Sequence, residues 1–205
     1  MGSLSAIPLI RERGKLKATE CPSSIVDHLS RTRQSGTKDL KILDVGPAVG
    51  SNVEFYSTFA TRIYIEDLYA SLSAARKEKP KDSLALFNEL LPYTEDIHFD
   101  YIMCWDLLNY LTASEITAFG QHLLKFSHPG TNLFAMISIA KSIPSAPRNY
   151  KITPEMRLLY EPTTSELIKC PRYNKNDISH LLPQFVRQRS FLLRNGTEEQ
   201  LLVAR

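Results

Sequence analysis

Between residues 40 and 140, short apolar runs alternate with longer segments whose apolar residues recur at helical spacing. The apolar runs predict four strands, at residues 41–45, 62–66, 99–106 and 133–139. The segments between them predict helices, at residues 52–59, 68–78, 82–91 and 112–126. Strands that are apolar almost throughout are buried on both faces, and strands that alternate with helices pair in parallel. The pattern therefore predicts an α/β fold with a mostly parallel central sheet and helices on both faces.

The last third of the chain follows a different pattern. Residues 144–171 contain five prolines, and the runs at 156–161 and 166–170 predict a hairpin over Pro162-Thr163-Thr164-Ser165. Near the C-terminus, Asn195-Gly196 between two strand-like runs predicts an antiparallel hairpin. We therefore divide the chain into an N-terminal arm and helix (1–39), a core (40–140), an insert (141–173) and a C-terminal helix and β-hairpin (174–205).

Polar pairs spaced three residues apart mark the expected starts of helices, because each member satisfies a backbone N–H at the helix end. Such pairs are Ser24 with Asp27, Thr112 with Glu115, and Asn174 with Asp177. The first pair predicts a short helix that ends at the break in residues 34–37. The arm before this helix has few apolar residues, so we expect it to be loosely held.

Length and composition are ordinary for a soluble globular domain: 205 residues, 43% hydrophobic and 23% charged. The net charge of +3 is too small to indicate a nucleic-acid partner. Residues 1–41 nevertheless hold eight basic and four acidic residues, which indicates either a solvated arm or a contact with an anionic partner.

Three cysteines at wide spacing, an odd number, favour reduced thiols and hence a cytoplasmic location. The cysteine and histidine spacings match no metal site, so no metal is expected. The N-terminus lacks the apolar core of a signal peptide, and no apolar run approaches the length of a membrane span. We therefore expect no association with a membrane.

The stretch LKILDVGPAVGSNVEF, residues 40–55, joins a strand to a helix through a glycine turn. Open parallel sheets bind ligands beyond the carboxyl ends of their strands, where this turn is expected to lie. A P-loop is excluded because the turn lacks its lysine. A dinucleotide fingerprint requires glycines at positions 46, 48 and 51, and only Gly46 is present. The pattern acid-x-G-x-G-x-G fits better, because Asp44, Gly46 and Gly50 match and only Ala48 departs.

Further features follow the glycine turn in order. They are Ile63-Tyr64-Ile65-Glu66-Asp67-Leu68, then Leu91-Pro92-Tyr93 before Phe99-Asp100-Tyr101-Ile102, then Pro129-Gly130 before the run at 133, and the closing Asn195-Gly196. Through this order the sequence resembles the class I S-adenosylmethionine-dependent methyltransferase superfamily, over residues 40–140 and 186–205. The resemblance implies a Rossmann-like methyltransferase fold. It also implies binding of S-adenosylmethionine, methyl transfer to an acceptor, and release of S-adenosylhomocysteine.

The resemblance places the cofactor beside the glycine turn. It implies that Asp44 fixes the turn and faces the cofactor's ammonium, unless it is a loop anchor alone. Glu66 is expected to accept the ribose hydroxyls and Asp67 to cap the next helix, with the reverse assignment left open. Trp105 either belongs to the core or lines the site. The expected cofactor-binding residues are therefore Asp44, Gly46, Ala48, Gly50, Glu66, Asp67 and Trp105.

Candidate residues for the acceptor follow the third predicted strand and continue into the insert. Asp106 is expected either to orient or deprotonate the acceptor or to cap the short turn after it. The insert is expected to cover the substrate, as inserts at this place often do in the family. The expected substrate residues are Asn109, Tyr150, Arg157, Tyr160 and Tyr173. The sequence identifies neither the acceptor nor the oligomeric state.

Two features depart from the family pattern. Ala48 carries a methyl group where glycine lets the backbone approach the methionine part of the cofactor, and we expect a negative φ there. Residues 86–88, where the family often has an acid for the adenine amine, read as helix. These departures favour an alternative function, a catalytically inactive methyltransferase-fold protein that works as a binding or scaffold module. A nucleotide-dependent oxidoreductase is a third reading, which the glycine turn disfavours.

Overall fold

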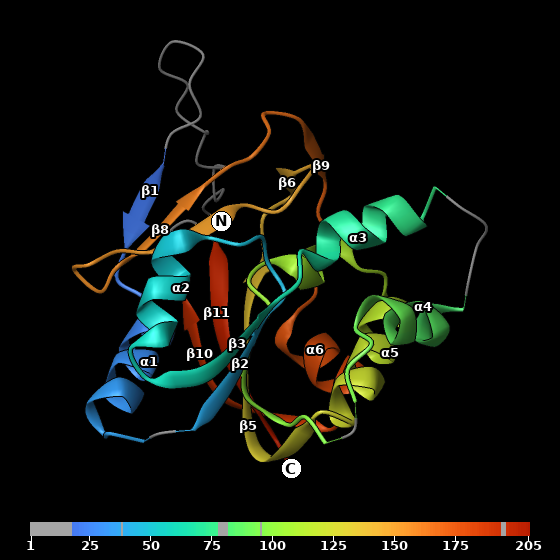
Figure 1. The fold of residues 1–205 in the computed structure, drawn as a ribbon. Helices are drawn as coiled ribbons and strands as arrows, with labels where there is room; N and C mark the ends of the chain where they lie inside the picture. Colours follow the sequence, from blue (N-terminus) through green and yellow to red (C-terminus); the bar gives the residue numbers. More distant parts are fainter. Residues whose placement is uncertain (1–17, 38, 78–81, 95, 194–195) are drawn as a thin grey trace.

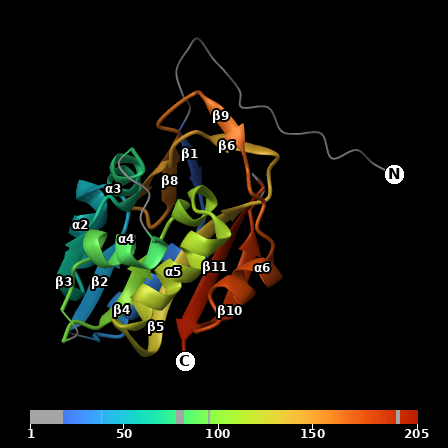
Figure 2. The ribbon, with the colours of Figure 1, turned by 90° about the vertical axis from the view of Figure 1, so that its right-hand side faces the viewer.

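The computed structural model describes residues 18–37, 39–77, 82–94, 96–193 and 196–205. Within these residues, six strands form a central sheet in the order β10-β11-β5-β4-β2-β3 (Figures 1 and 2). The strands are β2 (Leu40–Asp44), β3 (Ala60–Ile65), β4 (Phe99–Met103), β5 (Ser127–Ser138), β10 (Phe185–Leu192) and β11 (Thr197–Ala204). The strands β2 to β5 are parallel, and β11 is antiparallel to both β5 and β10. The predicted fold class, a mostly parallel sheet with a C-terminal antiparallel hairpin, is confirmed.

Helices cover both faces of the sheet, and each face has its own hydrophobic core. One face carries α1 (Ser24–Gln34) and α2 (Gly50–Ser57). The other carries α3 (Leu68–Ala75), α4 (Ser83–Leu90), α5 (Ala113–Leu124) and α6 (Lys175–Leu181), with the 3-10 helix η1 (Leu107–Tyr110). Successive strand residues point to opposite faces. Ile42 and Leu43 of β2 are accordingly both fully buried, one in each core.

The predicted helix starts are confirmed at two of three places. Capping boxes are present at Thr112 with Glu115 and at Asn174 with Asp177. At α1 the prediction is wrong by one residue, because Ser23 is the cap and its hydroxyl accepts from the N–H of Val26. Ser24 already lies in the first turn, where its N–H and hydroxyl both donate to the carboxylate of Glu199 on β11.

The insert contains the strands β6 (Ser142–Pro144), β7 (Asn149–Ile152), β8 (Leu158–Glu161) and β9 (Leu167–Lys169). β8 pairs with β7 and with β1 (Thr19–Cys21), whereas β9 pairs with β6. The hairpin predicted over Pro162 is therefore wrong. The chain reverses instead at Pro154, where the N–H of Met156 donates to the carbonyl of Thr153. Proline suits the second position of such a turn because its ring fixes φ.

The insert lies at one end of the sheet. Figure 2 shows β6, β9, β8 and β1 gathered at the end opposite the C-terminus. β11 runs toward the C-terminus and is antiparallel to β5, so the carboxyl ends of the parallel strands point toward the insert. β1 belongs to the segment expected as a loose arm; the rest of that arm, residues 1–17, lies outside the described residues.

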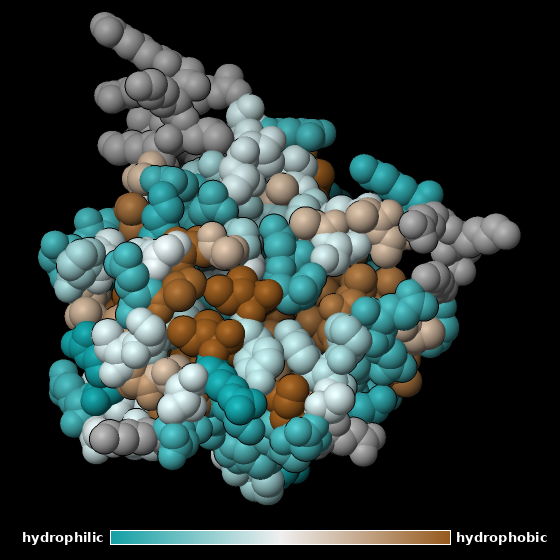
Figure 3. Space-filling view, in the orientation of Figure 1, coloured by the Kyte–Doolittle hydropathy of each residue, from teal (hydrophilic) through white to brown (hydrophobic). Residues whose placement is uncertain are grey.

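The opposite edge of the sheet ends at β3. Residues 83–90 form the helix α4, as predicted, and β3 has no neighbour beyond β2 among the described strands. Ile63, Tyr64 and Ile65 of β3 are only partly buried. Figure 3 shows hydrophobic side chains at the surface in the middle of this face, between α2 and α4. The helix α4 thus packs beside the sheet without extending it.

Candidate functional site

Asp44 ends β2 and anchors the glycine turn. Its side chain is buried, and Oδ1 accepts from the N–H of Gly46 (3.0 Å) and from the indole Nε1 of Trp105 (2.7 Å). Oδ2 accepts from the hydroxyl of Tyr56 on α2 (3.1 Å). A buried carboxylate needs such partners, because an unpaired one loses its hydration without compensation. Asp44 therefore ties together the glycine turn, the last turn of α2 and the segment after β4.

Trp105 follows β4 and packs directly on the turn. Its φ is +47°, a left-handed conformation that is rare for a bulky residue. A Cβ at Gly46 would lie 2.9 Å from Cδ1 of the indole, so the turn needs glycine there for a reason internal to the chain. Tyr150 of the insert stacks on the indole, with the ring centroids 5.2 Å apart and an angle of 7° between the ring planes. Trp105 is thus held between the turn and the insert.

A cavity of about 240 Å³ lies at the carboxyl ends of β2 and β4. One wall is the glycine turn, another the segment 104–107 after β4, and a third the insert at residues 146–150. Asp67 and Tyr69, at the start of α3, also line it, as do Asn52 and Thr163. Among the described residues of this wall, the charged side chains are Asp67, Asp106 and Arg148. The cavity lies where open parallel sheets bind their ligands.

Asp106 is buried in this wall and is paired on one side only. Its Oδ2 accepts from the N–H and from Nη1 of Arg148, at 3.3 and 3.2 Å. Its Oδ1 is buried and has no hydrogen-bond partner among the described residues. It precedes η1 but makes no side-chain cap there, so the capping alternative does not account for it. Burial raises the pKa of Asp106 to about 6, although Arg148 and the nearby hydroxyl of Tyr150 act in the opposite direction.

This raised pKa gives a testable pH dependence. We expect the free energy of unfolding, measured relative to Asp106→Asn, to fall as the pH rises from about 4 to about 7. Asp106 binds its proton more tightly in the folded state than in the unfolded state. The resulting stabilisation is complete below pH 3.8, the ordinary pKa of an aspartate, and is lost as the pH rises through about 6. The full difference is about 3 kcal/mol. Urea denaturation at several pH values measures it.

The comparison with Asp106→Asn has a built-in control. Burial lowers the pKa of His28 and of His122, which gives stability the opposite dependence on pH. Both histidines are present in the two proteins, so their contribution cancels in the difference. A difference that stays constant over this range would contradict a raised pKa at Asp106.

Glu66 and Asp67 follow β3 and have different surroundings. Asp67 lines the cavity, and its Oδ1 accepts from the N–H of Ala70 as the cap of α3, as predicted. Glu66 is not among the cavity-lining residues, and its carboxylate accepts from the hydroxyl of Ser71 (2.9 Å). Of the two acids, the one nearer the cavity is thus Asp67.

Ala48 and Gly50 lie on the outer side of the turn. Both are exposed, and neither is among the cavity-lining residues. Ala48 is not among the described residues with positive φ, in agreement with the prediction. A Cβ at Gly50 would meet nothing within 4 Å. The methyl group of Ala48 therefore does not fill the cavity, and the departure from the family's middle glycine leaves the site open.

The candidate substrate residues are not brought together. Tyr150 lines the cavity, and Tyr160 lies behind it with ring centroids 5.9 Å apart. Arg157 lies at the insert's turn and pairs with Glu20 (2.5 Å). Asn109 is buried; its amide donates to the carbonyls of residues 106 and 136 and accepts from the N–H of residue 138. Only Tyr150 of these four is positioned to meet a ligand in the cavity.

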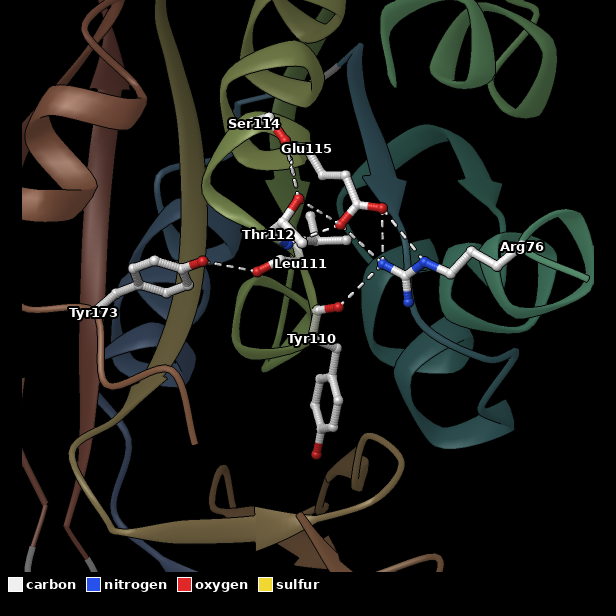
Figure 4. Close-up of polar contacts among 7 residues, drawn as sticks. All are labelled: Arg76, Tyr110, Leu111, Thr112, Ser114, Glu115 and Tyr173. Carbon is white, nitrogen blue, oxygen red and sulfur yellow. Dashed lines mark hydrogen bonds and ion pairs between the residues drawn. The ribbon is translucent and has the colours of Figure 1, made fainter. Parts of the chain in front are cut away.

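Tyr173 points toward the start of α5 (Figure 4). Its hydroxyl donates to the carbonyl of Leu111 (2.9 Å), next to the capping box of Thr112 and Glu115. Arg76, at the end of α3, donates to the carboxylate of Glu115 and also to the carbonyl of Tyr110. This network fixes the C-terminal end of η1, and the first residue of η1 lines the cavity. Tyr173 belongs to the network but does not itself line the cavity.

The insert is fastened to the core by residues that the sequence patterns did not single out. Asn52 of α2 is buried; its Nδ2 donates to the carbonyl of Tyr150 and its Oδ1 accepts from the N–H of Ile152. The hydroxyls of Tyr69 and Tyr110 donate to the carbonyls of residues 145 and 146. Together with Arg148, these contacts hold residues 145–152 over the cavity. No local pattern signals them, because each partner is distant in sequence.

The described part of the chain contains no group of three or more histidine, cysteine, aspartate or glutamate side chains arranged to hold a metal ion. Among the helices of the described residues, none combines the length and apolar character that crossing a membrane requires. The three cysteines are free, with Cys104 and Cys170 buried.

No protein-family model matches the sequence, and no curated protein matches it. Solved structures do match. An S-adenosylmethionine-dependent methyltransferase from Clostridium acetobutylicum ATCC 824 has a TM-score of 0.52 and 12% identity, covering 87% of this chain and 90% of that chain. CalS10, an amino pentose methyltransferase from Micromonospora echinaspora solved with bound S-adenosylmethionine, has a TM-score of 0.51 and 12% identity, covering 88% and 89%.

The glycopeptide N-methyltransferase MtfA, solved with S-adenosyl-L-methionine, has a TM-score of 0.51 at 10% identity. The match covers 90% of this chain and 94% of that chain. These TM-scores and coverages show a shared fold over nearly the whole length, and sequence identities of 10–12% carry no statement about substrates. The order of the strands, the glycine turn after β2 and the antiparallel finish all agree with that likeness. The chain therefore has the fold of the class I S-adenosylmethionine-dependent methyltransferases.

Proposed function

We propose that the chain binds S-adenosylmethionine in the cavity at the carboxyl ends of β2 and β4 and transfers its methyl group to an acceptor. The observation that carries the proposal is Oδ1 of Asp106, a buried oxygen that has no hydrogen-bond partner among the described residues and belongs to a side chain of the cavity wall. It comes within reach of a ligand when the insert moves. Leaving a buried polar atom unpaired costs about 1–3 kcal/mol. A ligand that donates a hydrogen bond to this oxygen would recover that cost.

The chemistry of the cavity wall fits the groups that this cofactor carries. The wall offers the carboxylate of Asp67 for hydroxyl groups and the aromatic rings of Trp105 and Tyr150 for apolar or cationic parts. It also holds both members of the Asp106–Arg148 ion pair, which suits a ligand with charges of both signs. Apolar residues of the glycine turn supply the remaining contact surface.

Admission of the whole cofactor requires the insert to move. Cavities that hold drug-sized ligands measure roughly 300–1,000 Å³, and this one measures about 240 Å³. We propose that residues 146–150 move outward when the cofactor enters and then close over it. Closure of such a segment excludes water from the reaction.

When bound, the cofactor supplies an activated methyl group. The chain's part is to align the acceptor and to keep water away. A general base is needed only where the acceptor keeps its proton at neutral pH. The acceptor is therefore left open in this proposal.

Calorimetry of the purified chain with S-adenosylmethionine, S-adenosylhomocysteine and NAD tests the proposal. We expect the first two to bind with a dissociation constant of about tens of micromolar, on the order of −6 kcal/mol. No heat and no shift of the unfolding temperature with either would refute it. Binding of NAD alone would favour an oxidoreductase instead.

Asp67 gives a second test of the site. We expect Asp67→Asn to weaken S-adenosylhomocysteine binding about tenfold, because the ribose hydroxyls lose a charged acceptor. Asparagine is as good a helix cap as aspartate, so the unfolding temperature should change little. Glu66→Gln is the matched control, and its effect should be less than about twofold because Glu66 faces Ser71. If Glu66→Gln weakens binding more than Asp67→Asn does, the ribose would be assigned to Glu66.

A second candidate function is a binding or scaffold module that has lost catalysis. It is favoured by the interactions of Asp44, whose carboxylate is already satisfied by three donors of the chain itself. The stack of Tyr150 on Trp105 also closes the cavity beside the turn. Transfer of a labelled methyl group to extracts or to candidate amines distinguishes the two functions. Binding without transfer to any acceptor would favour the module.

A further inference from the structure

The ion pair of Asp106 and Arg148 joins the core to the insert inside the cavity. Its members come from the segment after β4 and from the insert, and both line the cavity. The side chain of Asp106 is 1% exposed and that of Arg148 is 17% exposed. A buried pair is favourable only when the remaining hydrogen-bonding positions are satisfied. Here Oδ1 of Asp106 has no hydrogen-bond partner among the described residues, and the hydroxyl of Tyr150 is the neighbouring group that a ligand ammonium would replace beside the pair.

The charged side chains of the cavity wall determine which charged groups of a ligand can be paired there. Among the described cavity-lining residues, Arg148 is the one positive side chain, and Asp106 and Asp67 are the negative ones. Asp44, the acid that the glycine motif suggests for an ammonium group, is absent from the wall. Its carboxylate already accepts three hydrogen bonds. A ligand ammonium therefore has Asp106 as its best-placed partner near Arg148.

We propose that the Asp106–Arg148 pair is the binding site for an α-amino-acid group, the ammonium donating to Oδ1 of Asp106 and the carboxylate accepting from the guanidinium of Arg148. This inference rests on the proposed function, because it assigns the amino-acid end of the cofactor. The ion pair and the zwitterionic ligand group are complementary, because each charge of the ligand meets a side chain of opposite charge. A guanidinium has five N–H donors in a planar fork, so Arg148 can hold a ligand carboxylate while it stays near Asp106. Asp106 is then a binding residue, and not the base for the acceptor.

The test compares two ligands that share the nucleoside and the sulfur. S-adenosylhomocysteine carries the amino-acid chain on that sulfur, whereas 5′-methylthioadenosine carries a methyl group in its place. We expect Asp106→Asn to weaken S-adenosylhomocysteine binding at least about tenfold in calorimetry and to change 5′-methylthioadenosine binding less than about twofold. Arg148→Met should act in the same selective way.

A matched control comes from Asp67, at the other side of the cavity. Asp67→Asn should weaken both ligands equally, because both carry the ribose. Arg148→Met leaves Asp106 as an unpaired buried charge and thereby risks the fold. The double variant Asp106→Asn/Arg148→Met removes both charges and keeps the measurement possible. It should also lose the selectivity for S-adenosylhomocysteine.

The outcomes separate the inference from the proposed function. Equal loss of both ligands in Asp106→Asn overturns the inference and leaves the nucleoside site in place. Unchanged affinity for both, with reduced methyl transfer, also overturns it and makes Asp106 a catalytic residue. If the native chain binds neither ligand, the proposed function fails and the inference fails with it.

Discussion

Replacement of Asp44 by alanine is expected to lower the free energy of unfolding by about 3–5 kcal/mol. The substitution leaves three buried donors without their acceptor: the N–H of Gly46, the indole of Trp105 and the hydroxyl of Tyr56. Each hydrogen bond to a charged group contributes about 1.5–3 kcal/mol, and these contributions are not additive. Urea denaturation at neutral pH measures the loss.

Tyr56→Phe is the control for this prediction. It removes one of the three donors and leaves the carboxylate and the other two in place, so the expected loss is about 1–2 kcal/mol. Since the ring of Tyr56 stays buried, packing is retained. If Asp44→Ala costs no more than Tyr56→Phe, the carboxylate is not the centre of this network. The turn would then be held by the packing of Trp105 on Gly46.

Replacement of Asn52 by alanine is expected to release the insert from α2. The Asn52 side chain bonds both the carbonyl of Tyr150 and the N–H of Ile152, and all of these groups are buried. Two unsatisfied backbone groups cost about 2–4 kcal/mol. We expect faster amide hydrogen exchange over residues 149–152, because local opening there no longer breaks these bonds.

Ser51→Ala is a matched control at the neighbouring position. The hydroxyl of Ser51 is buried without a hydrogen-bond partner in the described chain, so its removal should not lower the free energy of unfolding. Exchange in the insert should stay as in the native chain. Equal exchange rates in Asn52→Ala and the native protein would show that the insert is held by other contacts, such as those of Tyr69 and Tyr110.

The core was predictable because its signals are local. The strands β2, β4 and β5 are apolar runs, and burial on both faces requires that composition whatever their partners. The capping box at Thr112 and Glu115 depends on residues that are close together in sequence, and so does the hairpin of β10 and β11. Asn195, in the turn predicted for that hairpin, lies outside the described residues. The position of the glycine turn followed from the same local information, and so did the helical reading of residues 86–88.

The site was only partly predictable, because its contacts join distant segments. Asp44 meets Trp105 across 61 residues, and Asn52 meets Tyr150 across 98. Arg148 lies among prolines, and no neighbour in sequence marks it as the partner of Asp106. The hairpin at Pro162 failed for a related reason. The segment offers several prolines, and pairing with β1 and β6 decides which of them turns the chain.

The packing of Trp105 has a practical consequence for optical spectroscopy. It is the single tryptophan of the chain, and its indole is bonded to a carboxylate and stacked on Tyr150 in the wall of the cavity. The intrinsic fluorescence of the protein therefore comes from the candidate site itself. Ligand entry, opening of the insert and loss of the Asp44 contact each change the surroundings of the same fluorophore. Emission can thus be followed without a label, in real time, in the native chain and in every variant that keeps Trp105.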